Sequence, residues 1–235
     1  YHSDEDTLEC VSELQKCQVP PGIEIETYIV DNSNSPELKN KLTKFSRVNY
    51  LSSPGNIGFA AGNNIGLKRC LSDNVDIIVM INNDTLVPKD FISSILSSPI
   101  IDEGVGAVGG LIYFAKGFEF EKQYQQSDLG KVIWYAGGKH DWENVYGTHV
   151  GVNEVDKGQY SEKVETDFIT GCLFITKPEV LAQSGLFDER YCLYNEDADL
   201  CMRVKAKNLK LIFDPNIKIW HKVAQSSGIG SPLND

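Results

Sequence analysis

Positive charge is scarce in this chain of 235 residues: 22 lysines and arginines stand against 33 aspartates and glutamates, which gives a formal charge of −11. Nucleic acids and anionic membranes are bound through a general positive field, so this balance argues against both as major partners. A signal peptide and an apolar run of 18 residues are also lacking, so no transmembrane helix is predicted. In so acidic a chain, an anionic ligand requires a local source of positive charge, such as a metal ion or a helix N-terminus.

Cysteine is infrequent and irregularly spaced. Six cysteines occur, at positions 10, 17, 70, 172, 192 and 201, and no Cys-X-X-Cys pair is among them. Several have apolar neighbours, as in the segment 171–174. We therefore expect buried, reduced thiols and a cytoplasmic location, with a disulfide pair as the alternative.

The known phosphate-binding glycine motifs are missing as well. Residues 54–66 contain four glycines and three asparagines, but no Gly-Lys-Ser/Thr follows and the glycine spacing is not that of a dinucleotide fingerprint. Glycines nevertheless let a backbone approach a ligand closely, and asparagine amides can bind hydroxyls and carbonyls. Asn56, Gly58 and Asn63 are therefore candidate ligand-binding residues, and a purely structural glycine loop is the alternative.

What is present is a pattern of alternating helices and strands, which predicts an α/β domain over residues 1–223 and a loose tail over 224–235. The predicted helices cover residues 7–17, 37–45, 88–96 and 178–183, with another that starts near Asp197. The predicted strands cover residues 23–30, 48–51, 75–81, 105–113, 167–176, 209–213 and 217–220. The run 75–81 is almost wholly apolar, as in strands of parallel sheets.

Polar residues follow three of these strands. Asp31 follows the strand 23–30, Asn82-Asn83-Asp84 follows 75–81, and His221 follows 217–220. Ligands of open α/β sheets bind beyond the carboxyl ends of strands, so Asp31 is placed to hold a sugar or base edge. Asp84 with its amide neighbours offers hard oxygen ligands for Mg²⁺ or Mn²⁺. A turn-forming aspartate and a structural histidine are the respective alternatives for Asp31 and His221.

Three carboxylates are concentrated at the start of the last predicted helix, in the sequence Asn195-Glu196-Asp197-Ala198-Asp199. The helix dipole favours negative charge there, and the apolar spacing that follows predicts a buried helix face. Carboxylates at the mouth of a buried helix are candidates for proton transfer or metal binding. An ordinary acidic helix N-terminus is the alternative.

Residues 115–165 differ from the rest in their weak periodicity. Trp134 precedes Gly137-Gly138, and Trp142 follows Asp141. Aromatic side chains beside glycines are typical of stacking platforms for sugars. Packing within the loops accounts for them equally well.

Seven motifs in order resemble the inverting family 2 glycosyltransferases of the GT-A fold, and most of all their rhamnosyltransferase-type branch. They are 30–33, 55–63, 81–85, 167–171, 185–189, 194–200 with Arg203, and His221. The resemblance implies a Rossmann-like, mostly parallel central sheet flanked by helices. It also implies a nucleotide-sugar half over about 1–114 and an acceptor half over about 115–223. The first strand of the family is absent from this sequence, which suggests that the chain is trimmed ahead of Tyr1.

The resemblance implies a role for each motif. Donor binding falls to Tyr1, Asp31, Asn56, Gly58, Asn63, Asn82, Asn83 and Asp84. The acceptor side is implied to use Asp167, Thr170 and Gly171, and we add Trp134 from its composition. Asp197 is implied to be the catalytic base with Glu196 beside it, and Asp84 with His221 to hold a divalent metal, Mg²⁺ or Mn²⁺. Asn82 stands where the first aspartate of the family's Asp-X-Asp motif is expected.

The implied reaction moves a sugar from a nucleoside diphosphate, dTDP-rhamnose or a UDP-sugar, to a glycan or lipid-linked hydroxyl in polysaccharide biosynthesis. Nucleic acid is not an expected partner, and the resemblance leaves open a peripheral association with the inner face of a membrane through regions outside this sequence. A non-catalytic nucleotide- or glycan-binding module and a metal-dependent nucleotidyltransferase are the alternatives.

Overall fold

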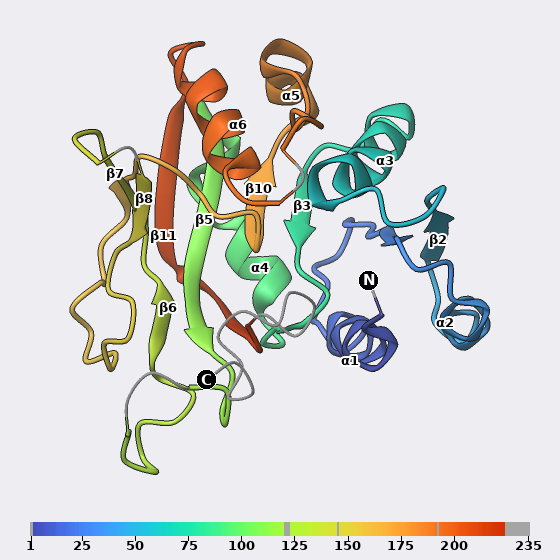
Figure 1. Cartoon of the computed structure of the whole chain (residues 1–235), viewed down its shortest axis with the longest axis horizontal. Helices are drawn as coiled ribbons and strands as arrows, with labels where there is room; N and C mark the ends of the chain where they lie inside the picture. The colour runs from blue at the N-terminus through green and yellow to red at the C-terminus, as the bar shows by residue number, and fades with distance from the viewer. Residues whose placement is uncertain (1, 120–122, 145, 192, 224–235) are drawn as a thin grey trace.

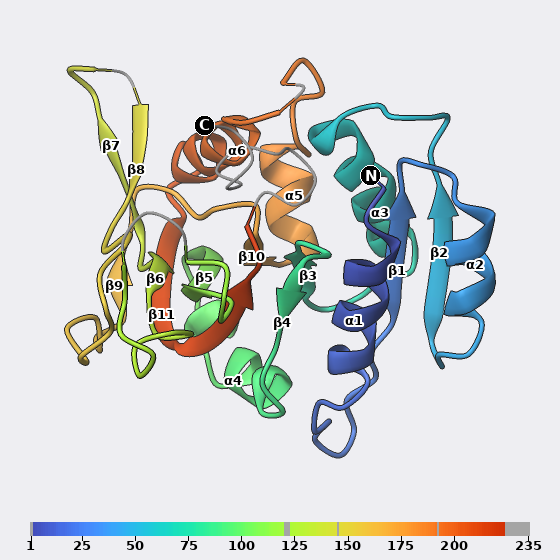
Figure 2. The same cartoon turned by 60° about the horizontal axis from the view of Figure 1, so that its bottom comes forward.

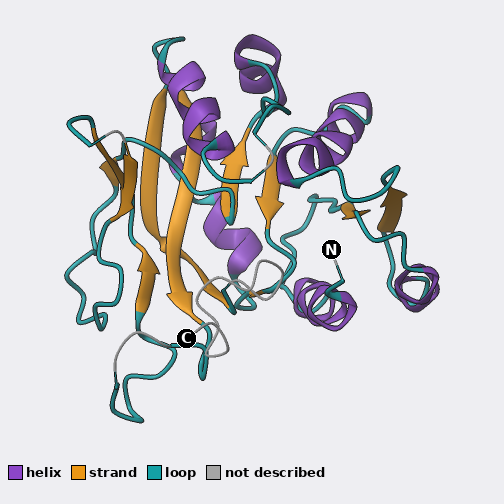
Figure 3. Ribbon diagram, in the orientation of Figure 1, coloured by secondary structure: helices purple, strands orange, loops and turns teal. Residues whose placement is uncertain are grey.

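A mixed sheet of seven strands forms the centre of the molecule (Figure 1). The structure is a computed structural model that describes residues 2–119, 123–144, 146–191 and 193–223. The main path of the sheet has the order β3-β10-β5-β11-β4, with β6 paired to β5 and β9 paired to β11. Helices lie on both of its faces (Figure 3), so that the sheet is covered as in other α/β folds.

The elements occur in the following places. The helices are α1 (Asp4–Leu14), α2 (Pro36–Leu42), α3 (Phe59–Ser72), α4 (Phe91–Leu96), the 3₁₀ turn η1 (Pro99–Ile101), α5 (Pro178–Ser184) and α6 (Glu196–Lys205). The strands are β1 (Thr27–Asp31), β2 (Val48–Ser52), β3 (Ile78–Ile81), β4 (Thr85–Leu86), β5 (Val105–Phe114), β6 (Ile133–Tyr135), β7 (Gly138–Asp141), β8 (Tyr146–His149), β9 (Val164–Glu165), β10 (Leu173–Thr176) and β11 (Lys210–His221).

The longest strands, β5 and β11, run parallel through the core. All ten residues of β5 are buried. Glycine is required at position 110 because a Cβ there would lie 2.5 Å from the backbone oxygen of Ile217. β11 is one strand where the sequence predicted two, and that prediction was wrong. Asp214-Pro215-Asn216 resembles a turn, but the chain passes it as an irregularity in register with β5 and continues to His221.

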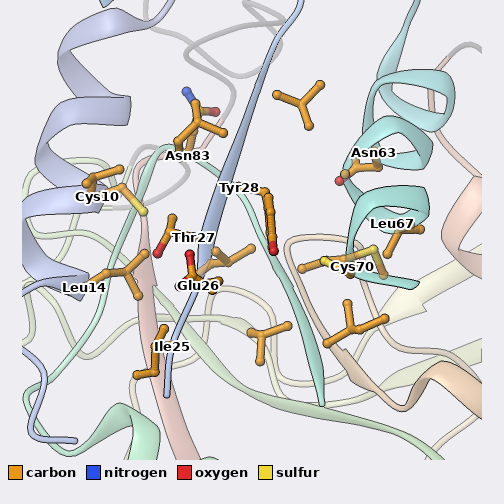
Figure 4. Close-up of a pocket in the computed structure, with 18 of the residues that line it drawn as sticks. Cys10, Leu14, Ile25, Glu26, Thr27, Tyr28, Asn63, Leu67, Cys70 and Asn83 are labelled. Carbon is orange, nitrogen blue, oxygen red and sulfur yellow. The ribbon is translucent and has the colours of Figure 1, made fainter. Parts of the chain in front are cut away.

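A second, two-stranded parallel sheet is formed by β1 and β2, beside α1, α2 and α3 (Figure 2). The free edges of β1 and β3 border a cavity of about 770 Å³, which α1 and α3 help to line (Figure 4). Among the described residues, β1 pairs only with β2, and β3 only with β10. The cavity therefore has strand edges on two sides, which suits the insertion of one more strand. The predicted missing first strand stays a prediction.

Three further local predictions need correction. Residues 167–172 do not form a strand, because β10 starts only at Leu173 after a turn at Gly171. The strand β1 starts at Thr27 rather than at residue 23. The glycine-asparagine segment is helical from Phe59 onward, since α3 begins there after Gly58, whose φ of 86° suits glycine. The expectation of a mostly parallel central sheet was also wrong. Among the described strands of that sheet only β5 and β11 pair in parallel, whereas β3, β4, β6, β9 and β10 join it through antiparallel pairing.

The described cysteines are free, and four of them, Cys10, Cys17, Cys172 and Cys201, are buried. Burial raises the pKa of Cys10 and Cys17 to about 11, so these thiols stay protonated. Cys192 lies outside the described residues. Within the described ranges, no helix has the length and hydropathy needed to cross a membrane.

Candidate active site

Asp84 and His221 form a buried pair at the end of the central sheet. His221 is the last residue of β11 and pairs with Thr85 of β4, which places its ring beside Asp84. The distance from His221 Nε2 to Asp84 Oδ1 is 3.0 Å, and both side chains are less than one-tenth exposed. Residues 137 positions apart are thus joined by strand pairing, as their places at strand ends predicted.

The chemistry of this pair fits a divalent cation. A carboxylate oxygen and an imidazole nitrogen are both ligands of Mn²⁺, and Mg²⁺ sites also use one or two carboxylates completed by substrate phosphates. His221 Nδ1 is buried and has no hydrogen-bond partner among the described residues. A set of three or more histidine, cysteine, aspartate or glutamate ligands is not found in the described part of the chain. A cation at this place would therefore need the ligand's own oxygens.

The two asparagines before Asp84 have different surroundings. The side-chain amide of Asn82 lies 3.4 Å from His221 Nε2 and thus faces the Asp84–His221 pair. The Asn83 amide instead donates to Ser3 Oγ at 2.6 Å and to Thr7 Oγ1 at 2.8 Å. Asn83, predicted to bind the donor, therefore uses its amide to tie the Asp84 turn to α1, a contact that no local pattern in the sequence predicts.

Asp197 is held in the first turn of α6 by backbone donors. Gly171 N donates to Asp197 Oδ2 at 2.9 Å, and Ala198 N lies 2.8 Å from Asp197 Oδ1. Asn195, the residue before α6, has a left-handed φ of 69°, a conformation that asparagine adopts more readily than most residues. Asp197 is half-buried, so its carboxylate is both fixed in place and accessible.

Glu196, beside Asp197, is buried more deeply. Its Oε2 atom has no hydrogen-bond partner among the described residues. Burial, with a smaller contribution from the charge of Asp197, raises the pKa of Glu196 to about 7. Two neighbouring carboxyl groups thus differ in their surroundings: Asp197 accepts from two backbone N–H groups, whereas Glu196 is buried and its Oε2 has no partner among the described residues.

The Asp84–His221 pair and Asp197 are connected by one short segment of chain. Asn82 N donates to the carbonyl oxygen of Cys172 at 3.0 Å, where β3 pairs with β10. The residue before Cys172 is Gly171, which donates to Asp197. The two carboxylates therefore lie on the same side of the molecule, at the ends of β3 and β10.

The glycine-asparagine segment 54–66 approaches Gly171 and Asp197 through the ring of Phe59. A Cβ at Gly171 would lie 3.1 Å from the Phe59 ring and 3.8 Å from Asp197 Cβ, so residue 171 must be small. Asn56 and Asn63 act within the segment: Asn56 accepts from Gly58 N at 3.3 Å, and Asn63 donates to the Phe59 carbonyl at 3.0 Å. The segment's start at α3 thus forms one wall beside Asp197.

Asp31 lies at the end of β1, as its place in the sequence predicted, but its oxygens are occupied. They accept hydrogen bonds from the backbone and hydroxyl of Ser33, from Ser35 N and from the Tyr50 hydroxyl. Burial opposes ionisation, but these hydrogen bonds outweigh it and hold the pKa of Asp31 below its usual range. The four acceptor positions of a carboxylate are thereby filled. Tyr1, the other predicted residue of this region, lies outside the described residues.

The residues predicted for the acceptor side fall into two groups. Trp134, in β6, places its ring 4.7 Å from that of His221 and is half-buried. Thr170 accepts from Cys172 N at 3.3 Å and shapes the turn that presents Gly171. Asp167 has other partners than Asp197. It accepts hydrogen bonds from Lys205 Nζ at 3.1 Å and from His140 N at 3.2 Å.

His149 lies beside Trp134, and the sequence did not predict it as a residue of this region. Its ring lies 4.5 Å from that of Trp134, and its Nδ1 atom is 3.1 Å from the Trp134 carbonyl oxygen. Burial lowers the pKa of His149, which favours the neutral imidazole. No local pattern marks this histidine, because its neighbours come from β6 and β11.

Comparison with known proteins identifies the family. The model of the family "Glycosyl transferase family 2" matches residues 1–181, more than half of the chain. The chain belongs to glycosyl transferase family 2. The family predicted from the seven motifs is thereby confirmed.

Curated relatives of this family 2 protein are distant in sequence. A low-salt glycan biosynthesis hexosyltransferase, Agl10, from Haloferax volcanii is 23% identical over 90% of this chain and 61% of its own. The dTDP-rhamnosyl transferase RfbF of Shigella flexneri is 22% identical over 88% of this chain and 64% of its own. An N-acetylglucosaminyl-diphospho-decaprenol L-rhamnosyltransferase of Mycobacterium tuberculosis is 25% identical over 65% and 49%. The chain spans about half to two-thirds of these relatives, two of which are rhamnosyltransferases.

Solved structures establish the fold as GT-A. GalNAc-T7 with UDP, GalNAc and Mn²⁺ superposes with a TM-score of 0.66 at 19% identity, over 87% of this chain and 39% of that one. The mannosyltransferase PcManGT of Pyrobaculum calidifontis with GDP-Man and Mn²⁺ gives 0.63 at 15% identity, over 97% and 56%. The predicted fold class is confirmed.

Proposed function

We propose that this chain is the catalytic region of an inverting, metal-assisted glycosyltransferase. The donor would be a nucleoside diphosphate sugar, dTDP-rhamnose or a UDP-sugar, and the acceptor a hydroxyl of a glycan or a lipid-linked glycan. The proposal rests above all on the placement of the Asp84–His221 pair and of Asp197 on either side of the segment 171–172. The names of the relatives, two of them rhamnosyltransferases, support the choice of donor.

The cation explains how so acidic a protein holds a pyrophosphate. With a formal charge of −11, the chain repels a nucleoside diphosphate unless a local positive charge offsets it. Asp84 and His221 would hold Mg²⁺ or Mn²⁺ together with the diphosphate oxygens. When bound, the ion would stabilise the negative charge of the departing nucleoside diphosphate. The solved structures with similar folds contain Mn²⁺ together with UDP or GDP-Man, which supports this assignment.

The chemical step is a single displacement. The acceptor oxygen attacks the anomeric carbon, the bond from that carbon to the phosphate oxygen breaks, and the electron pair leaves with the nucleoside diphosphate. The acceptor proton passes to a carboxylate oxygen of Asp197, which the backbone of residues 171 and 198 holds in place. Because attack comes from the face opposite the leaving group, the anomeric configuration is inverted.

The variant Asp197→Asn tests this assignment, because it keeps the shape of the side chain and removes its basicity. We expect transfer to fall by about 10² to 10⁴-fold, the usual contribution of a general base, while donor affinity stays unchanged. Release of nucleoside diphosphate in the presence of acceptor measures turnover, and calorimetric titration measures donor binding. Wild-type turnover in Asp197→Asn would remove this residue from the role.

The wild-type protein also separates the proposal from its alternatives. Donor binding without turnover toward any acceptor would favour a non-catalytic nucleotide- or glycan-binding module, in line with the asparagine at position 82. Release of pyrophosphate in place of nucleoside diphosphate would indicate a nucleotidyltransferase.

A further inference from the structure

A continuous row of rings leads from the Asp84–His221 pair to the surface. Successive ring centroids are 4.5 to 6.0 Å apart along the series His221, Trp134, His149, Phe168, His140 and Trp142. The row starts at the candidate cation site and ends on the β7–β8 hairpin, which stands at one edge of the molecule (Figure 1). It joins residues from four separate segments of the chain, so it is a product of the fold.

Strand pairing puts the row on one face of the hairpin. Gly138 pairs with His149 and His140 pairs with Gly147, and paired residues point to the same side of a sheet. A Cβ at Gly138 would lie 2.5 Å from the Phe168 ring, so glycine there lets that ring lie directly on the strand. The hairpin backbone is thereby fixed against the row.

Trp142 is the outer end of the row and is open to solvent. Its side chain is 65% exposed, and its ring lies 5.0 Å from that of His140. It lies one residue beyond the end of β7, in the turn of the hairpin. Tyr146, 51% exposed, belongs to the same hairpin, but it pairs with Asp141 and therefore points to the opposite face.

Hydrogen-bonding groups lie beside this end of the row. Asp167 accepts from His140 N at 3.2 Å and from Lys205 Nζ at 3.1 Å, and it is half-exposed. An exposed ring surface with the Asp167 carboxylate and the Lys205 ammonium group nearby suits a sugar, which has apolar C–H faces and a rim of hydroxyls. A lipid chain, in contrast, requires a contiguous apolar surface without such groups.

We propose that Trp142 forms a distal acceptor subsite, which stacks on a sugar ring of the acceptor glycan at least one ring away from the reacting hydroxyl. The orientation of the glycan rests on the proposed function, because it assumes that the reacting end lies at Asp197. Binding at Trp142 does not depend on catalysis, so the two proposals can fail separately. The enzyme would accordingly prefer an acceptor of several sugars over a single one.

The test compares Trp142→Ala, Trp142→Phe and Tyr146→Ala with the wild-type chain. A glycan array of bacterial surface oligosaccharides identifies the strongest binder, which is then titrated as its mono-, di-, tri- and tetrasaccharide without donor. We expect Trp142→Ala to weaken binding of the longer glycans by about tenfold and to leave that of the monosaccharide unchanged. Trp142→Phe should restore most of the affinity, since it keeps an aromatic face. Tyr146→Ala should bind like the wild type.

Several results would overturn the subsite. These are the absence of wild-type binding to any glycan on the array, an equal loss for short and long glycans, or an equal loss in Tyr146→Ala. If the effect of Trp142→Ala instead depends on a lipid tail attached to one glycan, the surface binds lipid and the proposal is wrong. Thermal unfolding of each variant checks the fold, and we expect no change at these exposed positions. Glycan binding with no turnover of any donor would refute the proposed function alone.

Discussion

At the scale of single residues, the site joins carboxyl groups with opposite environments. Asp197 accepts two backbone hydrogen bonds, whereas Glu196 is buried and its Oε2 has no partner among the described residues. The sequence predicted both residues, because three carboxylates at a helix start are visible in it. It could not predict their difference, which arises from contacts with residues 26 positions away in the chain.

Glu196 gives a prediction about stability and pH. Its pKa is raised to about 7 in the folded protein, so the folded state binds more protons than the unfolded state between about pH 4.5 and 7. The free energy of unfolding therefore falls as pH rises through this window. Glu196→Gln removes the titration and should be more stable than the wild type at pH 8, by roughly 3 kcal/mol at most, and similar to it at pH 5. Urea unfolding at both pH values measures this. An equal stability difference at pH 5 and pH 8 would contradict it.

His149 is a residue near the candidate cation site that the sequence did not predict. Trp134 was predicted as a sugar-stacking residue from its composition, and its role in acceptor binding is still a prediction. His149 carries no comparable local pattern, yet its ring lies between those of Trp134 and Phe168. The pairing of β7 with β8 and the hydrogen bonds of Val150 to residues 136 and 137 bring it there.

At the scale of elements, strand ends were the most predictable feature. Asp31, Asp84 and His221 each lie where a strand ends, as their order in the sequence predicted. Strand limits set by long-range contacts were not predictable. The centre of the segment 167–172, Phe168-Ile169-Thr170, resembles a strand, but the turn at Gly171 donates a hydrogen bond to Asp197 instead. The sequence at Asp214 likewise resembles the end of a strand, but β11 only shifts its register against β5 there and continues to His221.

The cavity between β1 and β3 is expected to accept an additional β-strand. A segment of five β-branched residues, attached ahead of Tyr1 by a short linker, should enter the cavity and pair with both free strand edges. Hydrogen exchange of the amides in β1 and β3 should then slow by about tenfold or more. The matched control carries proline at alternate positions of the segment, because proline cannot donate to a strand ladder. Equal exchange with both extensions would show that the cavity does not accept a strand.

At the scale of the whole molecule, net charge and site chemistry act against each other. The formal charge of −11 argues against polyanionic partners, while the proposed donor itself carries a diphosphate. The proposed function would resolve this conflict with a single cation at the end of the central sheet. Its central claim is that Asp84 and His221 supply that cation's protein ligands and that Asp197 works on the same side of the molecule.

Calorimetric titration of dTDP and of UDP into the protein, once with Mn²⁺ and once with EDTA, tests this claim most directly. We expect that one of the two nucleotides binds with Mn²⁺, that EDTA abolishes this binding, and that Asp84→Asn weakens it by at least about tenfold. Asp197→Asn serves as the matched control and should bind like the wild type. Equal binding with EDTA, or full affinity in Asp84→Asn, would contradict the account.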